Sequence, residues 1–477
     1  MFRHFIFFNL FLINISYTQD LVINEIMSNN NTCVLDVDGE PSDWIEIYNP
    51  TNNNVNLNNY TLSDDPNTLN KWAFPNINIS SDSTLMIFAS GKDIKVGNEL
   101  HTNFKLAASG EFIYLSKSEK QIVDYIMPVI LEEDESYGRL PDGSTNLLHL
   151  DICTPNSSNN NTNQLVFSNK PGFYNQPFNL YIQSLLSDTI YYTLDGSIPN
   201  TNSYLFQDSI LIYSRDFDAN HFSEFPTSPH QSTIDYPAWT SPSEIIKKAN
   251  IIRCISYRNG QPSSKVHTQT YFVNNGIEKK YNLPIMSIVT DELNFFSSDS
   301  GIYVPGVFFD ENDPNWTGNY FQKGIMWERP IHVEYFNENG LIKFSQDAGV
   351  RIHGGKTRAA AQKSLRLYAR KEYGKKYFNY PLMGNNNINQ YKRFIIQTTM
   401  GCWGHSIIKD VVSHNIVKNS NLETQDFQPA IVFLNGEYWG VHTIREYIDE
   451  YYINDKYETE EDVEILEGYI NTCEIFN

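Results

Sequence analysis

A basic segment stands out in an otherwise acidic chain. Residues 351–376 contain nine Lys or Arg residues and one Glu, whereas the whole chain has a formal net charge of −21. This local reversal of charge favours an anion site, because a phosphate group needs fixed positive charges near it. We expect Arg351 and Arg366 to contact the anion. Gly354 and Gly355 have no side chains, so their backbone N–H groups can approach a phosphate closely.

Phosphoryl transfer requires a cation and a carboxylate near the nucleotide, and Lys363 and Glu446 are residues of these two types. A fixed cation holds the phosphates, and a carboxylate holds the side chain of that cation. We predict Lys363 as the cation and Glu446 as its helix-borne carboxylate, with ATP and either Mg²⁺ or Mn²⁺ as cofactors of an active protein. Alternatively, segment 351–376 is a solvated basic face that balances residues 443–477, which hold eleven Asp or Glu and two Lys or Arg.

Three local patterns predict the elements that would position these residues. Residues 362–367 alternate polar and apolar side chains, so Lys363 is expected on the same strand face as two leucines. Asn435-Gly436 lies between two apolar runs, which predicts a tight β-hairpin. A helix opening near Glu446 is predicted to follow this hairpin, and residues 409–417 have helical character.

Several other chemistries are not supported by the sequence. The chain contains no HRD, DFG or GxGxxG motif, which excludes an ordinary eukaryotic-type protein kinase, and no GxSxG nucleophile motif. His353, His405 and His414 show no HExxH spacing, and we expect them to be structural or surface groups. The five cysteines form no CxxC pair, so no metal ligands are predicted. An exported chain is able to form a Cys33–Cys153 bridge.

Composition predicts a globular protein rich in β-structure. The chain has 477 residues, of which 40% are hydrophobic and 19% charged. This length is enough for about three domains. Thirty Tyr and twenty-nine Phe favour strands. The acidic net charge argues against nucleic acid as a partner, because phosphate contacts require a basic face.

The N-terminus predicts export. Arg3 and His4 precede a short apolar run from Phe5 to Ile15, and a cleavage after Thr18 would have small residues at the usual positions. Residues 1–18 are therefore predicted to be a cleaved signal peptide of a secreted, extracytoplasmic protein. No later segment is apolar enough to predict a transmembrane helix. The partner is predicted to be an extracytoplasmic protein or a cell-surface ligand.

Residues 19–150 are predicted to form a small β-sandwich, because short alternating strands are separated by Asn-rich turns. The phrases Ile23-Asn24-Glu25-Ile26, Asp43 to Pro50, Tyr60 to Asp64 and Trp72 to Pro75 resemble a lamin tail domain of the secreted bacterial type. A polar, low-complexity linker is predicted for residues 151–164.

A second β module is predicted for residues 165–274. Its strand Ile190 to Leu194 ends in an Asp195-Gly196 turn, and two further strands end the module. The pattern is similar to the immunoglobulin-like module at the C-terminus of chitobiases. Residues 214–248 carry four prolines and mixed polar residues, which predicts a long surface insertion.

Residues 281–477 have an α+β composition and resemble the spore-coat (CotH) kinase family, a group of secreted atypical protein kinases. The resemblance rests on the hairpin at Asn435-Gly436, with the Arg445-Glu446 pair that follows, and on Lys363. The fold class predicted for the whole chain is therefore multidomain, with two β-sandwich modules followed by an α+β, atypical-kinase-like region. The resemblance implies ATP-dependent phosphorylation of Ser or Thr in extracytoplasmic proteins.

The resemblance also implies that metal-binding aspartates follow a segment such as Val463 to Gly468. The pattern diverges at Tyr469, so we expect a C-terminally incomplete kinase-like region with impaired transfer. Asp449, Asp455 and Asp462 are expected to lie on a solvated acidic helix. The alternative function is that of a non-catalytic extracellular binding or adhesion protein, which would act through its two β modules.

Overall fold

The computed structural model divides the chain into two compact units, residues 1–163 and 164–477. The structure describes residues 20–97, 99–118, 121–131, 133–150, 152–161, 164–229, 239–273, 276, 282–383, 388–398, 409–420, 422–457, 465–467 and 474–476. The predicted signal peptide, His405 and Asp462 therefore lie outside the described residues.

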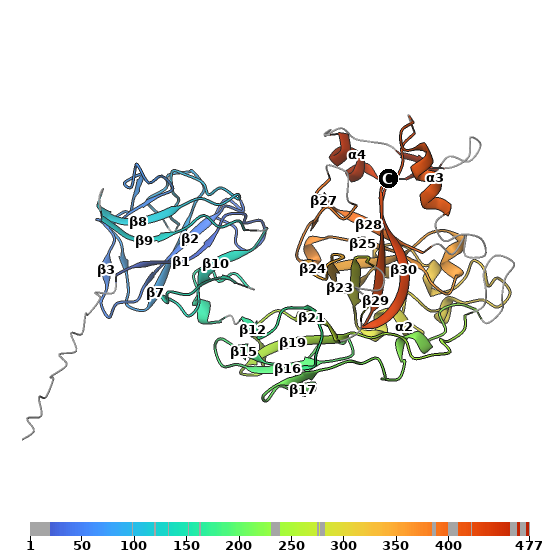
Figure 1. The fold of residues 1–477 in the computed structure, drawn as a ribbon. Coiled ribbons are helices and arrows are strands. Elements are labelled where there is room, and N and C mark those ends of the chain that lie inside the picture. Colours follow the sequence, from blue (N-terminus) through green and yellow to red (C-terminus); the bar gives the residue numbers. More distant parts are fainter. Residues whose placement is uncertain are drawn as a thin grey trace, which may run out of the picture. The chain divides into compact units, whose positions relative to one another are not determined.

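The first unit contains two main antiparallel sheets, as the alternating pattern predicts (Figure 1). One sheet has the order β11 (Leu147–Leu150), β10 (Ser136–Arg139), β1 (Val22–Met27), β2 (Trp44–Asn49) and β7 (Ser83–Phe88). The other has the order β5 (Trp72–Ala73), β4 (Thr61–Ser63), β8 (Ile113–Ser118) and β9 (Gln121–Ile126), and a small ribbon joins β3 (Val55–Asn56) to β6 (Asn78–Ile79).

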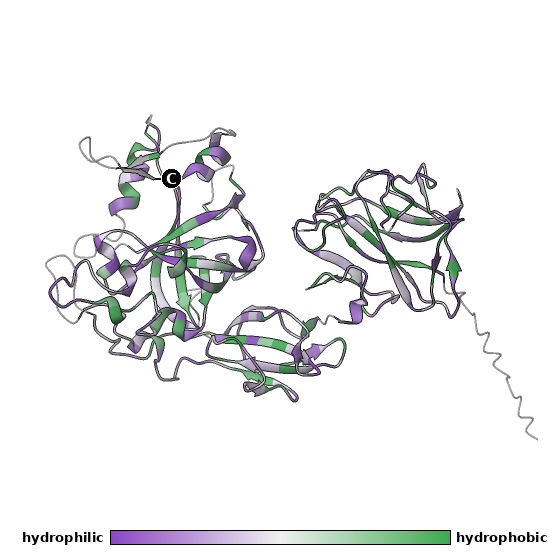
Figure 2. Cartoon of the chain, turned by 180° about the vertical axis from the view of Figure 1, so that it is seen from behind, coloured by the Kyte–Doolittle hydropathy of each residue, from purple (hydrophilic) through white to green (hydrophobic). Residues whose placement is uncertain are grey.

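One apolar core fills the space between the two sheets. It takes Ile45 from the first sheet and Trp72 and Leu115 from the second, all fully buried. Because neighbouring side chains on a strand point to opposite faces, hydrophobic and hydrophilic residues alternate along these strands (Figure 2). Cys33 and Cys153, a pairing that the sequence left open, form a disulfide with a sequence separation of 120.

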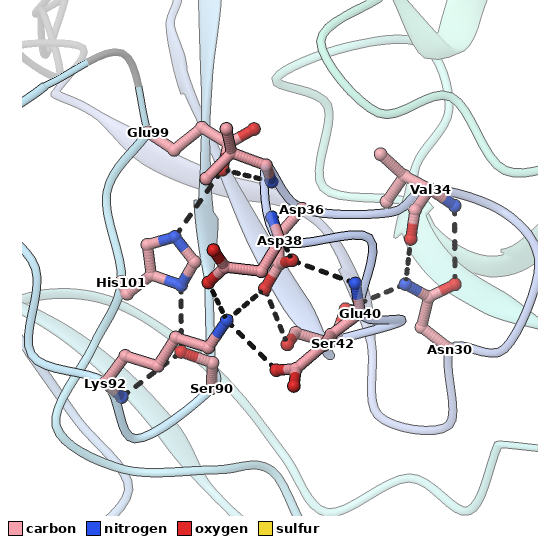
Figure 3. A network of polar contacts seen from close by, with 11 residues as sticks. Asn30, Val34, Asp36, Asp38, Glu40, Ser42, Ser90, Lys92, Glu99 and His101 are labelled. Carbon is pink, nitrogen blue, oxygen red and sulfur yellow. Dashed lines mark hydrogen bonds and ion pairs between the residues drawn. The ribbon is translucent and has the colours of Figure 1, made fainter.

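A polar network fixes the loop that leads into β2 (Figure 3). The ammonium group of Lys92 bonds the carboxylates of Asp36 and Asp38 at 2.7 Å and lies 3.0 Å from Glu40. One oxygen of Asp36 also accepts the backbone N–H groups of Asp38 and Glu40. The single positive charge of the lysine thereby offsets part of the repulsion among three carboxylates.

The predicted linker is part of the first unit over residues 152–161. Thr154 donates its hydroxyl to Glu25 at 2.6 Å, and the backbone N–H of Asn156 bonds Glu46 at 2.8 Å. Asn159 is fully buried and bonds a backbone carbonyl of the first sheet. The low-complexity composition concealed this role: the polar side chains are ordered because they supply donors to buried carboxylates.

The second unit begins with the predicted second β module. Its larger sheet contains β13 (Gly172–Tyr174), β21 (His267–Val273), β19 (Asn250–Arg258), β16 (Thr189–Thr193) and β17 (Tyr204–Leu205), with β20 (Gln261–Pro262) paired to β19. Two ribbons pair β12 (Leu165–Phe167) with β15 (Ile182–Ser184) and β14 (Phe178–Leu180) with β18 (Ile210–Ile212).

This module shares a core with the region that follows it. The ring of Phe272, from β21, packs edge-on against Phe433 and Phe336 at centroid distances of 5.0 and 5.6 Å. The expected surface insertion is also partly internal, since Phe222 belongs to the largest core and Phe225 stacks on Phe296 at 4.8 Å. The proline-rich composition predicted a loop but gave no indication of this burial.

A closed seven-stranded barrel dominates the third region. Its order is β22 (Ile285–Val289), β23 (Arg329–Phe336), β24 (Ile342–His353), β25 (Ser364–Tyr368), β28 (Arg393–Gln397), β30 (Glu437–Glu446) and β29 (Phe427–Leu434), and β29 pairs in parallel with β22. Smaller ribbons pair β26 (Phe378–Asn379) with β27 (Gln390–Tyr391) and β31 (Ile465–Glu467) with β32 (Glu474–Phe476).

The described α-helices of this region are α2 (Glu292–Phe296), α3 (Lys409–Val417) and α4 (Glu450–Tyr457). The helical prediction for residues 409–417 is confirmed. The α+β expectation is therefore met only by short helices around a β-barrel, and the kinase-like arrangement stays a prediction. No helix among the described residues is long and apolar enough to cross a membrane.

The hairpin prediction is confirmed, while the helix predicted after it is misplaced. Asn435 and Gly436 both have positive φ, 46° and 81°, which a two-residue turn between β29 and β30 requires. Strand β30 continues to Glu446, and α4 starts only at Glu450 (Figure 1). Glu446 is therefore borne by a strand, because β30 pairs with β28 along its second half.

Candidate anion-binding site

Arg351 and Arg366 are direct partners across β24 and β25. The residues on either side of each arginine belong to the barrel core, so the alternation of the strands directs both arginines to the outer face. These core neighbours are Val350, Ile352, Leu365 and Leu367. The two predicted anion contacts are therefore brought together, on the outside of the barrel.

Tyr368 is the centre of an arginine cluster on this outer face. The guanidinium groups of Arg351, Arg370, Arg366 and Arg393 lie 4.7, 4.9, 5.2 and 6.0 Å from the centroid of its ring. Tyr368 is only 4% exposed, and its buried hydroxyl has no hydrogen-bond partner among the described residues. Four guanidinium groups thus lie around one buried tyrosine ring, whose hydroxyl group has no hydrogen-bond partner among the described residues.

Three carboxylates compensate part of this charge. Buried Glu328 accepts from Arg351 at 2.8 Å and from Arg370 at 2.9 Å. Asp449 forms an ion pair with Arg393, and burial raises the pKa of Asp449. Asp449 is therefore a paired, partly buried residue that caps α4, and not a member of a solvated helix as expected. Glu450 is the third carboxylate, 3.7 Å from Arg393, so the four guanidinium groups still outnumber the carboxylates.

Arg366 differs from the other three arginines of the cluster. Among the described residues, no carboxylate lies within 4 Å of its guanidinium group, and its Nε atom is buried without a hydrogen-bond partner. The group lies between two tyrosine rings, 5.2 Å from the centroid of Tyr368 and 4.4 Å from that of Tyr447. Two cation–π contacts therefore restrain this guanidinium group while leaving it without a carboxylate partner among the described residues.

A pocket of about 300 Å³ adjoins the cluster and is strongly basic. It shares Tyr368, Arg370 and Arg393 with the cluster, so the two features are continuous. The complete lining is Tyr368, Ala369, Arg370, Lys371, Glu372, Lys376, Lys392, Arg393 and Tyr451. Five cations and one carboxylate around a volume of this size suit an anionic ligand with several oxygen atoms.

Lys363 lies on the other side of the barrel wall. Its fully buried ammonium group donates to the backbone carbonyls of Thr227, Ala360 and Arg358 at 2.6, 2.7 and 2.8 Å. The ring of Tyr320 lies 3.9 Å from the nitrogen, and burial lowers the pKa of Lys363 well below its usual value. All three N–H donors of a charged ammonium group are thereby engaged.

The expected pair of Lys363 and Glu446 is not formed. Lys363 precedes β25, whereas Glu446 pairs with Phe394, which pairs with Leu367. Glu446 therefore lies two strands away and about 13 Å further along the barrel, at ~3.3 Å per residue. Its carboxylate accepts the backbone N–H of Asp426 at 2.7 Å. The strand register, which the sequence does not reveal, separates the two residues.

Gly354 and Gly355 form the turn after β24. Gly354 has a φ of +112°, and its carbonyl accepts from Arg358. This backbone conformation favours glycine. A Cβ atom built on Gly355 would meet no atom within 4 Å, so the turn is open on that side. The room for a ligand is present, while the predicted contact of these N–H groups with phosphate stays a prediction.

The sequence interpretation missed Tyr368, Tyr447, Arg393 and Glu328. One signal was present: Arg366, Tyr368 and Arg370 alternate with apolar residues, which places them on one face of a strand. No local pattern indicates Arg393 or Tyr447, because both reach the site through strand pairing. Among the described residues, no group of three or more His, Cys, Asp or Glu is arranged to hold a metal ion.

Three segments of the chain match known protein families. Residues 350–475 match the CotH kinase protein family. This CotH match includes Arg351, Lys363, Arg366 and Glu446. Residues 14–128 match the Lamin Tail Domain, and residues 179–218, within the second β module, match a family described as Fn3 associated. No curated protein matches the chain.

Proposed function

We propose that the protein acts outside the cytoplasm and that its CotH region binds a phosphorylated nucleotide, ATP first, on the outer face of the barrel. The observation that carries the proposal is Arg366, a guanidinium group held between two tyrosine rings without a carboxylate partner among the described residues. Arg351, Arg393 and the basic pocket extend this positive surface. The CotH match supports ATP as the first ligand to test.

The chemistry of the donor set fits phosphates. Guanidinium groups bind phosphate through two parallel N–H···O bonds, and such charge-assisted bonds contribute about 1.5–3 kcal/mol each. The ring of Tyr451, which lines the pocket and is exposed, provides a surface on which a nucleobase can stack. The set does not fit a metal ion, because Glu328 and Asp449 are engaged by arginines. We therefore derive no step through Mg²⁺ or Mn²⁺.

Nucleotide-dependent phosphorylation of an extracytoplasmic protein is the finer form of this proposal. The CotH match supports it. A second candidate is anion binding without transfer, and one observation favours it: the donors of Lys363 are already engaged by three carbonyl groups. In this case the protein is an extracellular binding protein whose CotH region recognises a phosphorylated ligand.

Export is supported by the leader pattern of residues 1–18 and by the Cys33–Cys153 disulfide. Disulfides form and persist in oxidising compartments and are rare where glutathione keeps thiols reduced. N-terminal sequencing of the protein from the producing cell tests this part of the proposal. We expect a mature N-terminus near Gln19, and recovery of an intact Met1 would contradict it.

Isothermal titration calorimetry with ATP tests the binding site. Replacing Arg366 by Gln removes the unpaired guanidinium group and should weaken ATP binding by about tenfold or more, since ~1.4 kcal/mol corresponds to one decade. Arg215→Gln is the matched control, because Arg215 pairs with Asp218 in the preceding β module. Equal ATP affinity for both variants and the native protein would exclude the arginine cluster as the site.

Radiolabelled ATP separates the two candidate functions. A kinase should transfer label to itself or to an added protein, and Arg366→Gln should reduce the transfer. A binding protein should show the same loss of affinity in calorimetry with no transfer of label. Transfer that survives Arg366→Gln but is lost in Lys363→Met would favour the barrel interior over the outer face.

A further inference from the structure

His353 belongs to the same outer face as Arg366, although it plays no part in the proposal above. It ends β24 two residues after Arg351, and residues two apart on a strand share a face. Its ring meets the ring of Tyr447 edge-on at 5.9 Å, and the guanidinium group of Arg366 lies 4.4 Å from the same ring. His353, Tyr447 and Arg366 therefore form one contiguous group.

The imidazole ring of His353 is kept neutral by its surroundings. Burial, together with the positive charges of Arg366 and Arg358, lowers the pKa of His353 to about 4. Neither ring nitrogen has a hydrogen bond to another described residue, and the side chain is partly accessible. A neutral imidazole has one N–H donor and one nitrogen lone pair that accepts a hydrogen bond.

None of the charged groups of the cluster provides a neutral hydrogen-bond acceptor of this kind. The arginines only donate hydrogen bonds. The carboxylates of Glu328 and Asp449 accept, but arginines already engage them. His353 therefore adds a neutral acceptor to the group that it forms with Arg366 and Tyr447. A ligand that matches this surface carries a phosphate for the arginines and, next to it, a hydroxyl group for the histidine.

We propose that His353 is a specificity-determining residue that accepts a hydrogen bond from a hydroxyl group of the ligand. This inference rests on the proposed function, because it assumes that Arg366 holds a phosphate. It names the ligand class: phosphate esters of sugars or nucleosides, which carry a hydroxyl group, are preferred over phosphate esters that carry none.

Calorimetry on the full-length protein with two probes tests the inference. Ribose 5-phosphate carries hydroxyl groups, and methyl phosphate carries the same phosphate without them. We expect the native protein to bind ribose 5-phosphate about fivefold more tightly or better, the effect of one good hydrogen bond. His353→Leu should abolish this preference and leave the affinity for methyl phosphate within about twofold. His353→Gln, which keeps an acceptor oxygen, should retain most of the preference.

The possible outcomes are distinct. A preference that survives His353→Leu overturns the inference and leaves the phosphate site intact. An equal loss of affinity for both probes also overturns it, since the histidine would then contact the phosphate or only support the fold. If the native protein binds ATP but neither probe, this inference is overturned while the proposed function stands. If it binds neither ATP nor the probes, the proposed function is refuted, and this inference is refuted with it.

Discussion

Glu46→Gln in the first unit gives a sharp test of how burial controls ionisation in this protein. Glu25 and Glu46 are direct partners across β1 and β2, and both are almost fully buried. Like charges directly opposite each other in a sheet are destabilising. The donors that reach Glu46 are the side-chain amide of Asn24 at 3.2 Å and the backbone N–H of Asn156 at 2.8 Å. No described cation pairs with either carboxyl group.

The sign and size of the effect follow from the pKa values. Burial raises the pKa of Glu46 from 4.5 to about 8, and the charge of Glu25 adds to the increase. Between these two pH values the folded chain holds a proton that the unfolded chain has lost, so stability falls as the pH rises through this window. At ~1.4 kcal/mol per pKa unit, the loss above a pH of about 8 is on the order of 3–5 kcal/mol.

Glutamine has the shape of the protonated carboxyl group and does not titrate. Glu46→Gln should therefore change stability little near pH ~5, and should stabilise the first unit by a few kcal/mol near pH ~9. Differential scanning calorimetry of the full-length protein at both pH values measures this. The transition of the first unit is the one that reduction of the Cys33–Cys153 disulfide shifts.

Glu40→Gln is the matched control, because it removes the same charge from a side chain that is 64% exposed. It should change stability by less than ~1 kcal/mol at both pH values. Equal destabilisation by Glu46→Gln at both pH values would refute the reasoning. It would mean that the folded protein holds Glu46 ionised and stabilised at low pH.

Three further predictions concern the residues that organise the fold. Lys363→Met should lower stability by about 1–3 kcal/mol, because three buried carbonyl groups lose their donor. The ATP affinity of the folded variant should stay near native, and a selective loss of ATP binding would contradict this. Gly436→Ala should destabilise far more than Gly260→Ala in urea titrations, because a strained backbone position is costlier where the new atom also clashes. Both have positive φ, but only the new Cβ at Gly436 would meet a backbone oxygen, at 2.7 Å. Cys33→Ser should destabilise the first unit by about 4–5 kcal/mol, as expected for so long a closed loop, and an unchanged calorimetric transition would exclude a structural role.

Local features of this protein could be read from the chain alone. The Asn435-Gly436 turn, the helix at residues 409–417 and the alternating strands of the β modules each follow from short-range preferences of the backbone. The clustering of positive charge in residues 351–376 is also visible in the sequence, while its use as an anion site stays a prediction. These properties depend on neighbours in the chain, so the amino-acid sequence contains all that is needed to predict them.

The tertiary structure decided which residues that are distant in the sequence lie close together. Strand register placed Glu446 far from Lys363, and strand pairing brought Arg393 opposite Tyr368, whose ring Arg366 also approaches. Burial determined the roles of the segments that looked unstructured, since residues 152–161 and the insertion at Phe222 supply donors and apolar side chains to distant parts of the chain. Register and burial are sums over many weak contacts between remote residues, and no local window of the sequence contains them.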